Sequence, residues 1–253
     1  MEARSTGRVR PAAFTEADVE LDDTLDNLDG AVNYAGWIFE LMEPHLGREI
    51  LEVGAGNGTF TELLARRPGR VVASDLSMRR VEVMQKRFAG MTNVDVVHGD
   101  IAVTARHGNY DSAVLINVLE HIEDDDAALR QLREMLEPGG RLVVWVPAFE
   151  GLYSEFDRKV GHFRRYRLAG LQSQLREAGF EIVQIRYANA IGAIAWWLVA
   201  RVLRRQPTAR SSVRLFDRNV VPVVKYLESR RRPPFGQSIF AVAARSADSR
   251  TNE

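Results

Sequence analysis

The sequence predicts an α/β protein with a doubly wound, mostly parallel sheet. Five short apolar segments alternate with segments of helical spacing between residues 49 and 146. The first apolar segment ends in glycines at alternate positions, Gly54, Gly56 and Gly58, and the second ends at Asp75, 21 residues after Gly54. Because glycine lets the backbone turn sharply and approach a ligand closely, we expect a nucleotide-type binding corner after the first strand.

The composition of the 253 residues limits the class of protein. The 34 basic and 34 acidic residues balance, which argues against the broad basic surface of a nucleic-acid-binding protein. There are no cysteines, so disulfides, Cys-based zinc sites and thiol catalysis are excluded. The longest apolar run, 190–200, is too short to span a bilayer and is interrupted by Gly192. With no signal-peptide pattern either, we expect a cytoplasmic protein without a transmembrane segment.

The chain is expected to consist of a flexible N-terminal segment, 1–29, and one domain, 30–253. The expected strands are 50–53, 70–74, 94–97, 110–117, 141–146, 181–187 and 237–244. The expected helices are 32–46, 59–66, 78–88, 124–136, 168–178 and 190–203. The less regular part, 147–232, is interpreted as insertions that form a cap or acceptor site.

Four motifs follow one another in the chain. They are L-E-V-G-A-G-N-G at 51–58, V-V-A-S-D-L-S at 71–77, V-H-G-D-I at 97–101, and N-V-L-E-H-I-E-D at 117–124 with L-E-P-G-G-R-L-V-V at 136–144. With these motifs the chain, over about residues 30–245, resembles the class I S-adenosylmethionine-dependent methyltransferases, especially the small-molecule branch of UbiE- and UbiG-like enzymes. The resemblance implies a seven-stranded sheet of order 3-2-1-4-5-7-6, with the last strand antiparallel and with an acceptor-binding insertion.

The resemblance also implies which residues hold S-adenosylmethionine as cofactor. The glycine loop would lie against its methionine end, Asp75 would accept hydrogen bonds from the ribose hydroxyls, and Asp100 would accept one from the adenine amine. The complete set of expected cofactor-binding residues is Tyr34, Glu52, Gly54, Gly56, Gly58, Asp75, Leu76, Ser77, Asp100, Ile101 and Asn117. A dehydrogenase is the rival interpretation, but its G-x-G-x-x-G fingerprint is not matched here.

The expected chemistry is a direct displacement at an activated sulfonium, so positioning of the acceptor is its main requirement. A base is needed only if the acceptor keeps its proton at neutral pH, as a hydroxyl does. The expected catalytic residues are His162, Tyr166 and His121, and the expected substrate-binding residues are Tyr153, Arg164, Arg165, Trp196 and Trp197. The alternatives are that the segment around His162 is a salt-bridged connector, and that Trp196 and Trp197 form a dimer face.

A metal site is not predicted. In some UbiG-like enzymes an acid followed by a Glu-His pair is proposed to hold a divalent cation near the acceptor. This sequence keeps the pair, Glu120 and His121, but has Asn117 at the position of the first acid. Two ligands rarely suffice to hold such an ion.

The sequence therefore predicts an enzyme, a methyltransferase that acts on a small-molecule acceptor, at oxygen, in specialised metabolite biosynthesis. N- or C-methylation of an aminosugar or polyketide-type metabolite is the near alternative, and a non-catalytic S-adenosylmethionine-binding scaffold is the second. Nucleic acid is not an expected partner. The apolar segment 190–203 and the basic residues after it leave contact with a membrane surface as a less favoured alternative.

Overall fold

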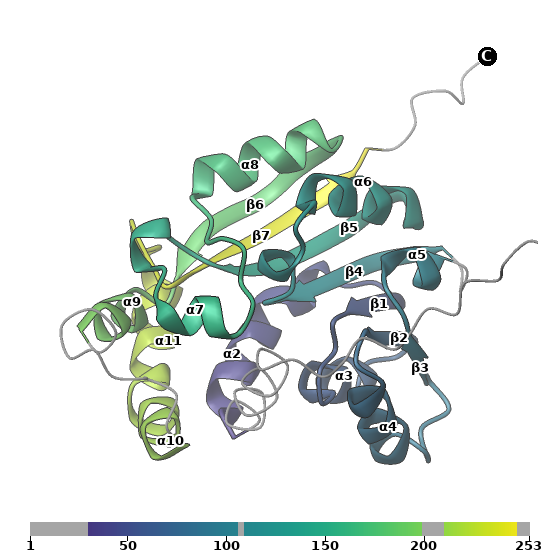
Figure 1. Ribbon diagram of the computed structural model, residues 1–253, viewed down its shortest axis with the longest axis horizontal. Helices are drawn as coiled ribbons and strands as arrows, with labels where there is room; N and C mark the ends of the chain where they lie inside the picture. The colour runs from purple at the N-terminus through teal and green to yellow at the C-terminus, as the bar shows by residue number, and fades with distance from the viewer. Residues whose placement is uncertain (1–29, 106–108, 199–209, 247–253) are drawn as a thin grey trace, which may run out of the picture.

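A seven-stranded sheet forms the centre of the computed structural model, which describes residues 30–105, 109–198 and 210–246 (Figure 1). Its strands are β1 (Glu49–Val53), β2 (Arg70–Asp75), β3 (Val94–His98), β4 (Tyr110–Ile116), β5 (Leu136–Pro147), β6 (Phe180–Ala188) and β7 (Ser238–Arg245). The order is β3-β2-β1-β4-β5-β7-β6. The first five strands pair in parallel, whereas β7 is antiparallel to both β5 and β6. The predicted fold class and strand order are confirmed.

Helices cover both faces of the sheet (Figure 1). One face carries α5 (Ile101–Thr104), α6 (Asp125–Met135) and α8 (Leu168–Glu177). The other carries α2 (Val32–Met42), α3 (Thr59–Ala65), α4 (Met78–Arg87), α10 (Arg210–Asn219) and α11 (Val221–Arg230). The shorter helices are α7 (Glu155–Lys159), α9 (Ala190–Trp196) and the 3₁₀ turns η1 (Glu43–His45), η3 (Leu119–His121) and η4 (Glu150–Leu152).

The central strands are apolar throughout because both of their faces are buried. Alternate residues of a strand point to opposite faces, so β4 contributes Leu115 to the core under α6 and Val114 to the core over α2. Neither of these side chains has any exposed surface. This double burial fixes the register of the sheet, and with it the edge at which the carboxyl ends of the strands meet.

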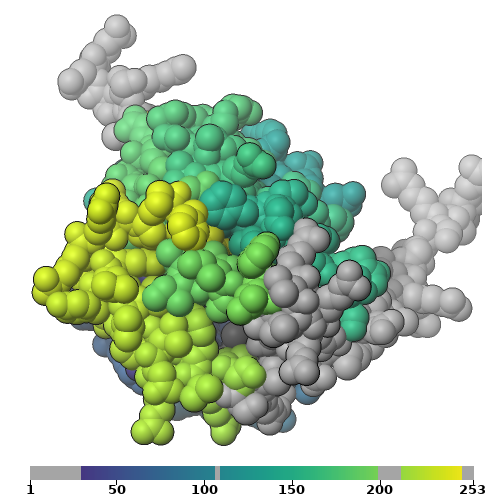
Figure 2. Space-filling view, turned by 90° about the vertical axis from the view of Figure 1, so that its left-hand side faces the viewer, coloured from purple at the N-terminus to yellow at the C-terminus, as the bar shows by residue number. Residues whose placement is uncertain are grey.

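Four α-helices of the described residues were not predicted. Helices α5 and α7 are only four and five residues long, and α10 and α11 lie in a stretch whose many arginines hide the helical pattern. The structure ties α10 to α2 through Asp217, whose carboxylate accepts hydrogen bonds from the backbone N–H groups of Asn33 (3.1 Å) and Tyr34 (2.8 Å). Figure 2 shows α9 (green) beside α10 and α11 (yellow-green), and together they form one wall of the molecule.

Several boundaries also differ from the prediction. Strand β5 begins at Leu136 rather than at residue 141, because Leu136 already pairs with Tyr110 of β4. Helix α9 spans Ala190–Trp196, and the rest of the expected helix beyond residue 198 lies outside the described residues, as does the segment 1–29. Within the described ranges, every helix is too short or too polar to cross a membrane.

Candidate cofactor and acceptor site

A cavity of about 1810 Å³ opens at the carboxyl ends of β1, β2 and β4, and parts of α2, α7, α9 and α10 complete its wall. The strand order reverses between β1 and β4, which is where an open α/β sheet binds its ligands. A pocket for one small molecule measures roughly 300–1,000 Å³. The cavity therefore has room for a cofactor and an acceptor together.

The glycine loop between β1 and α3 needs its glycines for two different reasons. Gly54 has φ +67°, lines the cavity, and would place an added Cβ 2.6 Å from the Val118 side chain. Gly58 has φ +82°, but its added Cβ would meet the Phe88 ring at 2.6 Å, and Gly58 does not line the cavity. Gly54 thus belongs to the ligand side of the loop, whereas Gly58 is required for packing against α4.

Asp75, at the end of β2, connects the glycine loop to the next loop. One carboxylate oxygen accepts a hydrogen bond from the Gly56 N–H (2.9 Å), and the other accepts one from the Ser77 N–H (2.8 Å). Arg80 lies 3.8 Å from the second oxygen, and Asp75 is 4% exposed. A carboxylate oxygen can accept two hydrogen bonds, so the ribose role predicted for Asp75 is compatible with these contacts.

Glu52, in β1, is a second buried acid on the cavity wall. The Thr61 hydroxyl donates a hydrogen bond of 2.6 Å to it. Burial and, to a lesser extent, the nearby Asp75 charge raise the pKa of Glu52 to about 8, although the Thr61 hydrogen bond lowers it. An ammonium group bound beside Glu52 would favour the ionised carboxylate.

Most of the other expected cofactor residues also line the cavity. Those that do are Tyr34, Glu52, Gly54, Gly56, Asp75, Leu76, Ser77, Asp100, Ile101 and Asn117. Asp100 caps α5 by accepting a hydrogen bond from the Val103 N–H (2.9 Å). Asn117 has φ +52°, a left-handed conformation uncommon outside glycine, and this turns the chain sharply at the end of β4.

His162 lines the cavity and is held by Asp157. Its Nδ1 is 2.9 Å from the Asp157 carboxylate, which is fully buried and also accepts two hydrogen bonds from Arg165 (2.7 and 3.1 Å). Burial alone would raise the pKa of Asp157, but the contacts with His162 and Arg165 hold it at about 2. Since an ionised carboxylate can only accept, Nδ1 is the donor in this contact, and in the neutral ring the lone pair lies on Nε2.

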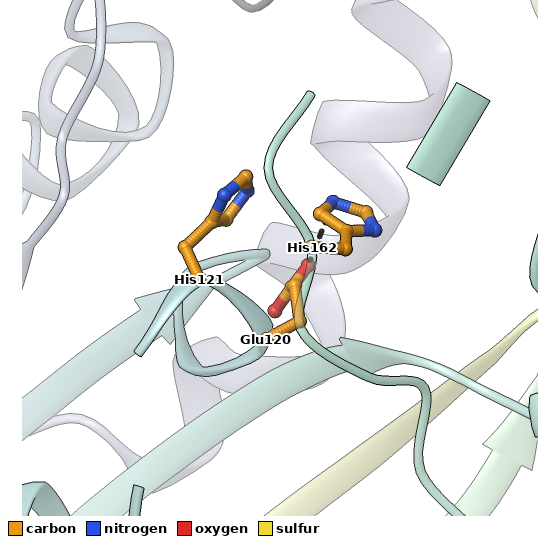
Figure 3. A group of neighbouring side chains, drawn as sticks. All are labelled: Glu120, His121 and His162. Atoms are coloured by element: carbon orange, nitrogen blue, oxygen red, sulfur yellow. Dashed lines mark ion pairs between the residues drawn. The ribbon is translucent and has the colours of Figure 1, made fainter. Parts of the chain in front are cut away.

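Glu120 and His121 come from η3, directly after β4, and face His162 (Figure 3). Glu120 has no exposed surface, and burial raises its pKa to about 8. His121 meets the His162 ring edge-on at 4.6 Å between centroids. Burial, followed by the charges of His162 and Arg80, lowers the pKa of His121 to about 3, so it is neutral at pH 7. One donor atom from each of the three lies within 4.8 Å of the other two.

This arrangement removes the reason for predicting no metal site, which was the lack of a third ligand beside Glu120 and His121. His162 supplies the third donor atom. It follows His121 by 41 residues, and no spacing rule in the sequence links the two.

Besides Gly58, four predicted catalytic or substrate-binding residues lie outside the cavity. Tyr166 is 4% exposed, and its hydroxyl donates a hydrogen bond to Asp125 (2.8 Å), so its assignment as a catalytic phenol is wrong. Arg164, which was predicted to bind the substrate, donates a hydrogen bond to the same Asp125 (2.6 Å). The Tyr153 hydroxyl donates to the His162 backbone carbonyl (2.7 Å), and Trp197 is 52% exposed on the surface. Tyr153, Arg164 and Tyr166 stabilise the segment around His162 and, on this geometry, do not contact an acceptor.

Arg165 and Trp196 do line the cavity, as predicted for acceptor-site residues. The Arg165 guanidinium lies over the Trp196 ring, 5.1 Å from its centroid. Both are also anchored, Arg165 by Asp157 and Trp196 by a hydrogen bond to the Leu152 carbonyl (3.3 Å). The cavity wall thus includes a cation and an aromatic ring in contact, each anchored to the protein.

The prediction missed Asp157, which organises this side of the cavity. The sequence contained one signal for it, the spacing from Ser154 to Asp157, which is typical of a helix-capping box. The Ser154 backbone N–H (2.8 Å) and hydroxyl (3.0 Å) both donate to Asp157. A five-residue helix gave too little periodicity for this signal to be used.

The fold and the loop geometry define a cofactor-binding α/β protein, and comparison with known proteins identifies its class. The profile of a family described as "Methyltransferase domain" matches residues 30–185. The match covers more than half of the chain, so the chain belongs to this methyltransferase-domain family. Methyltransferases of this family use S-adenosylmethionine as methyl donor.

Similar curated proteins match over part of the chain. A demethylmenaquinone methyltransferase of Clavibacter sepedonicus is 33% identical over 41% of this chain and 42% of its own length. A ubiquinone biosynthesis O-methyltransferase of Paracidovorax citrulli is 27% identical over 42% of this chain and 45% of its own length. A 37.1 kDa protein in transposon TN4556 of Streptomyces fradiae is 33% identical over 61% of this chain and 46% of its own. The chain thus spans about half the length of the curated relatives it matches.

Solved structures show the same fold at low identity. The [4+2]-cyclase SpnF has a TM-score of 0.60 at 18% identity, covering 94% of this chain and 98% of its own. Coclaurine N-methyltransferase bound to N-methylheliamine and S-adenosylhomocysteine has a TM-score of 0.58 at 16% identity, covering 85% and 72%. One fold therefore serves a cyclase and a methyltransferase, so the reaction has to be argued from the residues of the site.

Proposed function

We propose that the protein transfers the methyl group of S-adenosylmethionine to a hydroxyl oxygen of a small molecule. The observation that carries the proposal is that His121 and His162 converge on the cavity wall, beyond Asn117 at the end of β4. A hydroxyl acceptor has to lose its proton during transfer, and neutral imidazole groups suit that task near pH 7. On this proposal the two histidines bind the acceptor hydroxyl and accept its proton.

The cofactor half of the proposal rests on the glycine loop and two acids. Asp75 would bind the ribose, Glu52 would lie near the ammonium group, and Asn117 would lie beside the sulfonium. The cationic donor is favoured there because two buried carboxylates face one part of the cavity. Since the donor is already activated, the wall around Trp196 and Arg165 contributes by holding the acceptor in line with the methyl group.

The cofactor assignment can be tested by calorimetry with S-adenosylhomocysteine. We expect Asp75→Ala to weaken binding sharply, on the order of a hundredfold, because two charge-assisted hydrogen bonds and the loop anchor are lost. The matched control is Asp95→Ala, which removes an exposed aspartate of β3 that pairs with Arg70 of β2. Equal affinity in Asp75→Ala and the control would exclude the ribose assignment.

The acceptor assignment can be tested by transfer of a labelled methyl group to phenols, catechols and quinols. These are the first choices because relatives are named for ubiquinone biosynthesis and for demethylmenaquinone. We expect His162→Gln to abolish turnover while the affinity for S-adenosylhomocysteine is kept. His45→Gln, which changes a histidine outside the cavity, is the control. Label on nitrogen or carbon would instead favour the alternative acceptors, and binding without turnover on any acceptor would favour a scaffold.

A further inference from the structure

We propose that Glu120, His121 and His162 bind a first-row transition-metal dication, of which Zn²⁺ is representative. Their three donor atoms lie within 4.8 Å of one another. Figure 3 shows the Glu120 carboxylate between the two imidazole rings. Two imidazoles and one carboxylate are a donor set of catalytic zinc sites, which keep a further position open. The inference rests on the proposed function, because it concerns the same wall of the cavity.

Glu120 gives the strongest indication of a bound ion. Its side chain is completely buried, and neither carboxylate oxygen has a hydrogen-bond partner among the described residues. Buried carboxylates are otherwise paired or coordinate metals, since an isolated one is strongly destabilising. The His162 Nε2 is 3.8 Å from one Glu120 oxygen, which is too long for a hydrogen bond. A dication held by both groups would satisfy the two together.

His162 is oriented for coordination by its other nitrogen. Asp157 holds Nδ1–H at 2.9 Å, so Nε2, which lies 3.8 Å from a Glu120 oxygen, is the nitrogen that remains for a metal. A carboxylate behind a ligating histidine is the usual outer partner in metal sites, where it fixes the tautomer and the ring orientation. Asp157 is itself fixed by Arg165 and by Ser154 at the start of α7. The fold therefore builds a rigid histidine ligand, although α7 is only a short helix.

The donor set favours a transition metal over Mg²⁺ or Ca²⁺, which prefer oxygen ligands. The donor atoms of a tetrahedral Zn²⁺ site lie about 3.4 Å apart. Side-chain rotations that bring the three donor atoms this close together would complete the coordination. The nearest arginines do not oppose the ion, because Arg165 is paired with Asp157 and Arg80 with Asp75. A bound dication would act as a Lewis acid that makes the acceptor hydroxyl release its proton to solvent more readily, and the two histidines would then serve as metal ligands in place of the proton-accepting role proposed above.

The site can be tested by titration of the purified protein with Co²⁺, followed by visible absorption, and with Zn²⁺ in competition. We expect one equivalent to bind to the wild type and to His45→Gln, and no binding to Glu120→Gln or His162→Gln. Circular dichroism establishes that each variant is folded. Asp157→Asn should still bind, but about 10–100-fold more weakly, as expected when the partner of a ligating histidine is lost.

Three results would overturn the proposal: no Co²⁺ bound by the wild type, equal binding by Glu120→Gln, or an equal loss in His45→Gln. The experiment also separates this proposal from the proposed function. Methyl transfer by a wild type that binds no Co²⁺ would refute the metal site and leave the proposed reaction intact. Stoichiometric Co²⁺ binding without transfer to any acceptor would support the metal site and count against the proposed reaction.

Discussion

Replacement of Asp157 by asparagine tests how the acceptor side of the cavity is held together. The carboxylate is fully buried and accepts hydrogen bonds from His162, from Arg165 twice, and from Ser154. Asparagine keeps the shape but loses the charge, so the buried Arg165 guanidinium is left without its counter-ion. Removing one partner of a buried ion pair typically costs about 3–5 kcal/mol.

We expect Asp157→Asn to lower the free energy of unfolding by about 3 kcal/mol, because asparagine still accepts one hydrogen bond. For a chain of this size that corresponds to a fall in Tm of roughly 6–12 °C. The pKa of Asp157, about 2 against an ordinary 3.8, adds a pH test. Its contribution is present above pH 4 and is lost as the pH falls toward 2, a change of about 2 kcal/mol.

The assay is urea unfolding followed by circular dichroism, at pH 7 and at steps down to pH 2. The matched control is Glu155→Gln in the same helix, because Glu155 pairs with Arg158 on the exposed surface. An exposed ion pair of this kind contributes little to stability. If Asp157→Asn is as stable as Glu155→Gln, the Asp157 network does not hold the segment, and the argument for an oriented His162 fails.

Three further outcomes follow from the site geometry. Gly54→Ala should destabilise the protein by roughly 1–3 kcal/mol in urea unfolding, since its φ is +67° and its new Cβ would lie 2.6 Å from Val118; no change would mean that the loop relaxes freely. Glu52→Gln should be more stable than the wild type at pH 9, by roughly 3 kcal/mol, and equally stable near pH 5. The reason is that the pKa of Glu52, raised to about 8, makes the buried acid destabilising as the pH rises. Calorimetry should also show weaker cofactor binding by this variant, and equal stability of variant and wild type at both pH values would refute the burial argument. Tyr166→Phe should lower the free energy of unfolding by about 1–3 kcal/mol, because Asp125 loses the hydrogen bond from the phenol, and should keep the turnover per folded molecule. A loss of turnover would indicate a catalytic role for the phenol.

The cofactor side of the cavity was predictable from the sequence because its signals are local. A buried strand, a glycine loop and an acid at the end of the next strand each appear as short patterns. Gly54 and Asp75 line the cavity where their strand ends place them. The exception, Gly58, has the same pattern as Gly54 but serves a packing contact with Phe88, which spacing does not distinguish.

The acceptor side was less predictable because its contacts join distant parts of the chain. Tyr166 and Arg164 both bind Asp125, some 40 residues earlier, and this decides that they are structural. His162 and Glu120 approach each other across a similar distance in sequence. The dense cluster of polar residues predicts functional groups in this segment, but only the fold determines which of them face the cavity.

The central claim is tested most directly by incubating the protein with a panel of phenolic, catecholic and quinol acceptors and with S-adenosylmethionine that carries an isotopically labelled methyl group. The products are analysed by mass spectrometry and NMR. The account predicts label on an acceptor oxygen, formation of equimolar S-adenosylhomocysteine, and loss of both in His162→Gln but not in His45→Gln. Label on nitrogen or carbon, or full activity in His162→Gln, would contradict it.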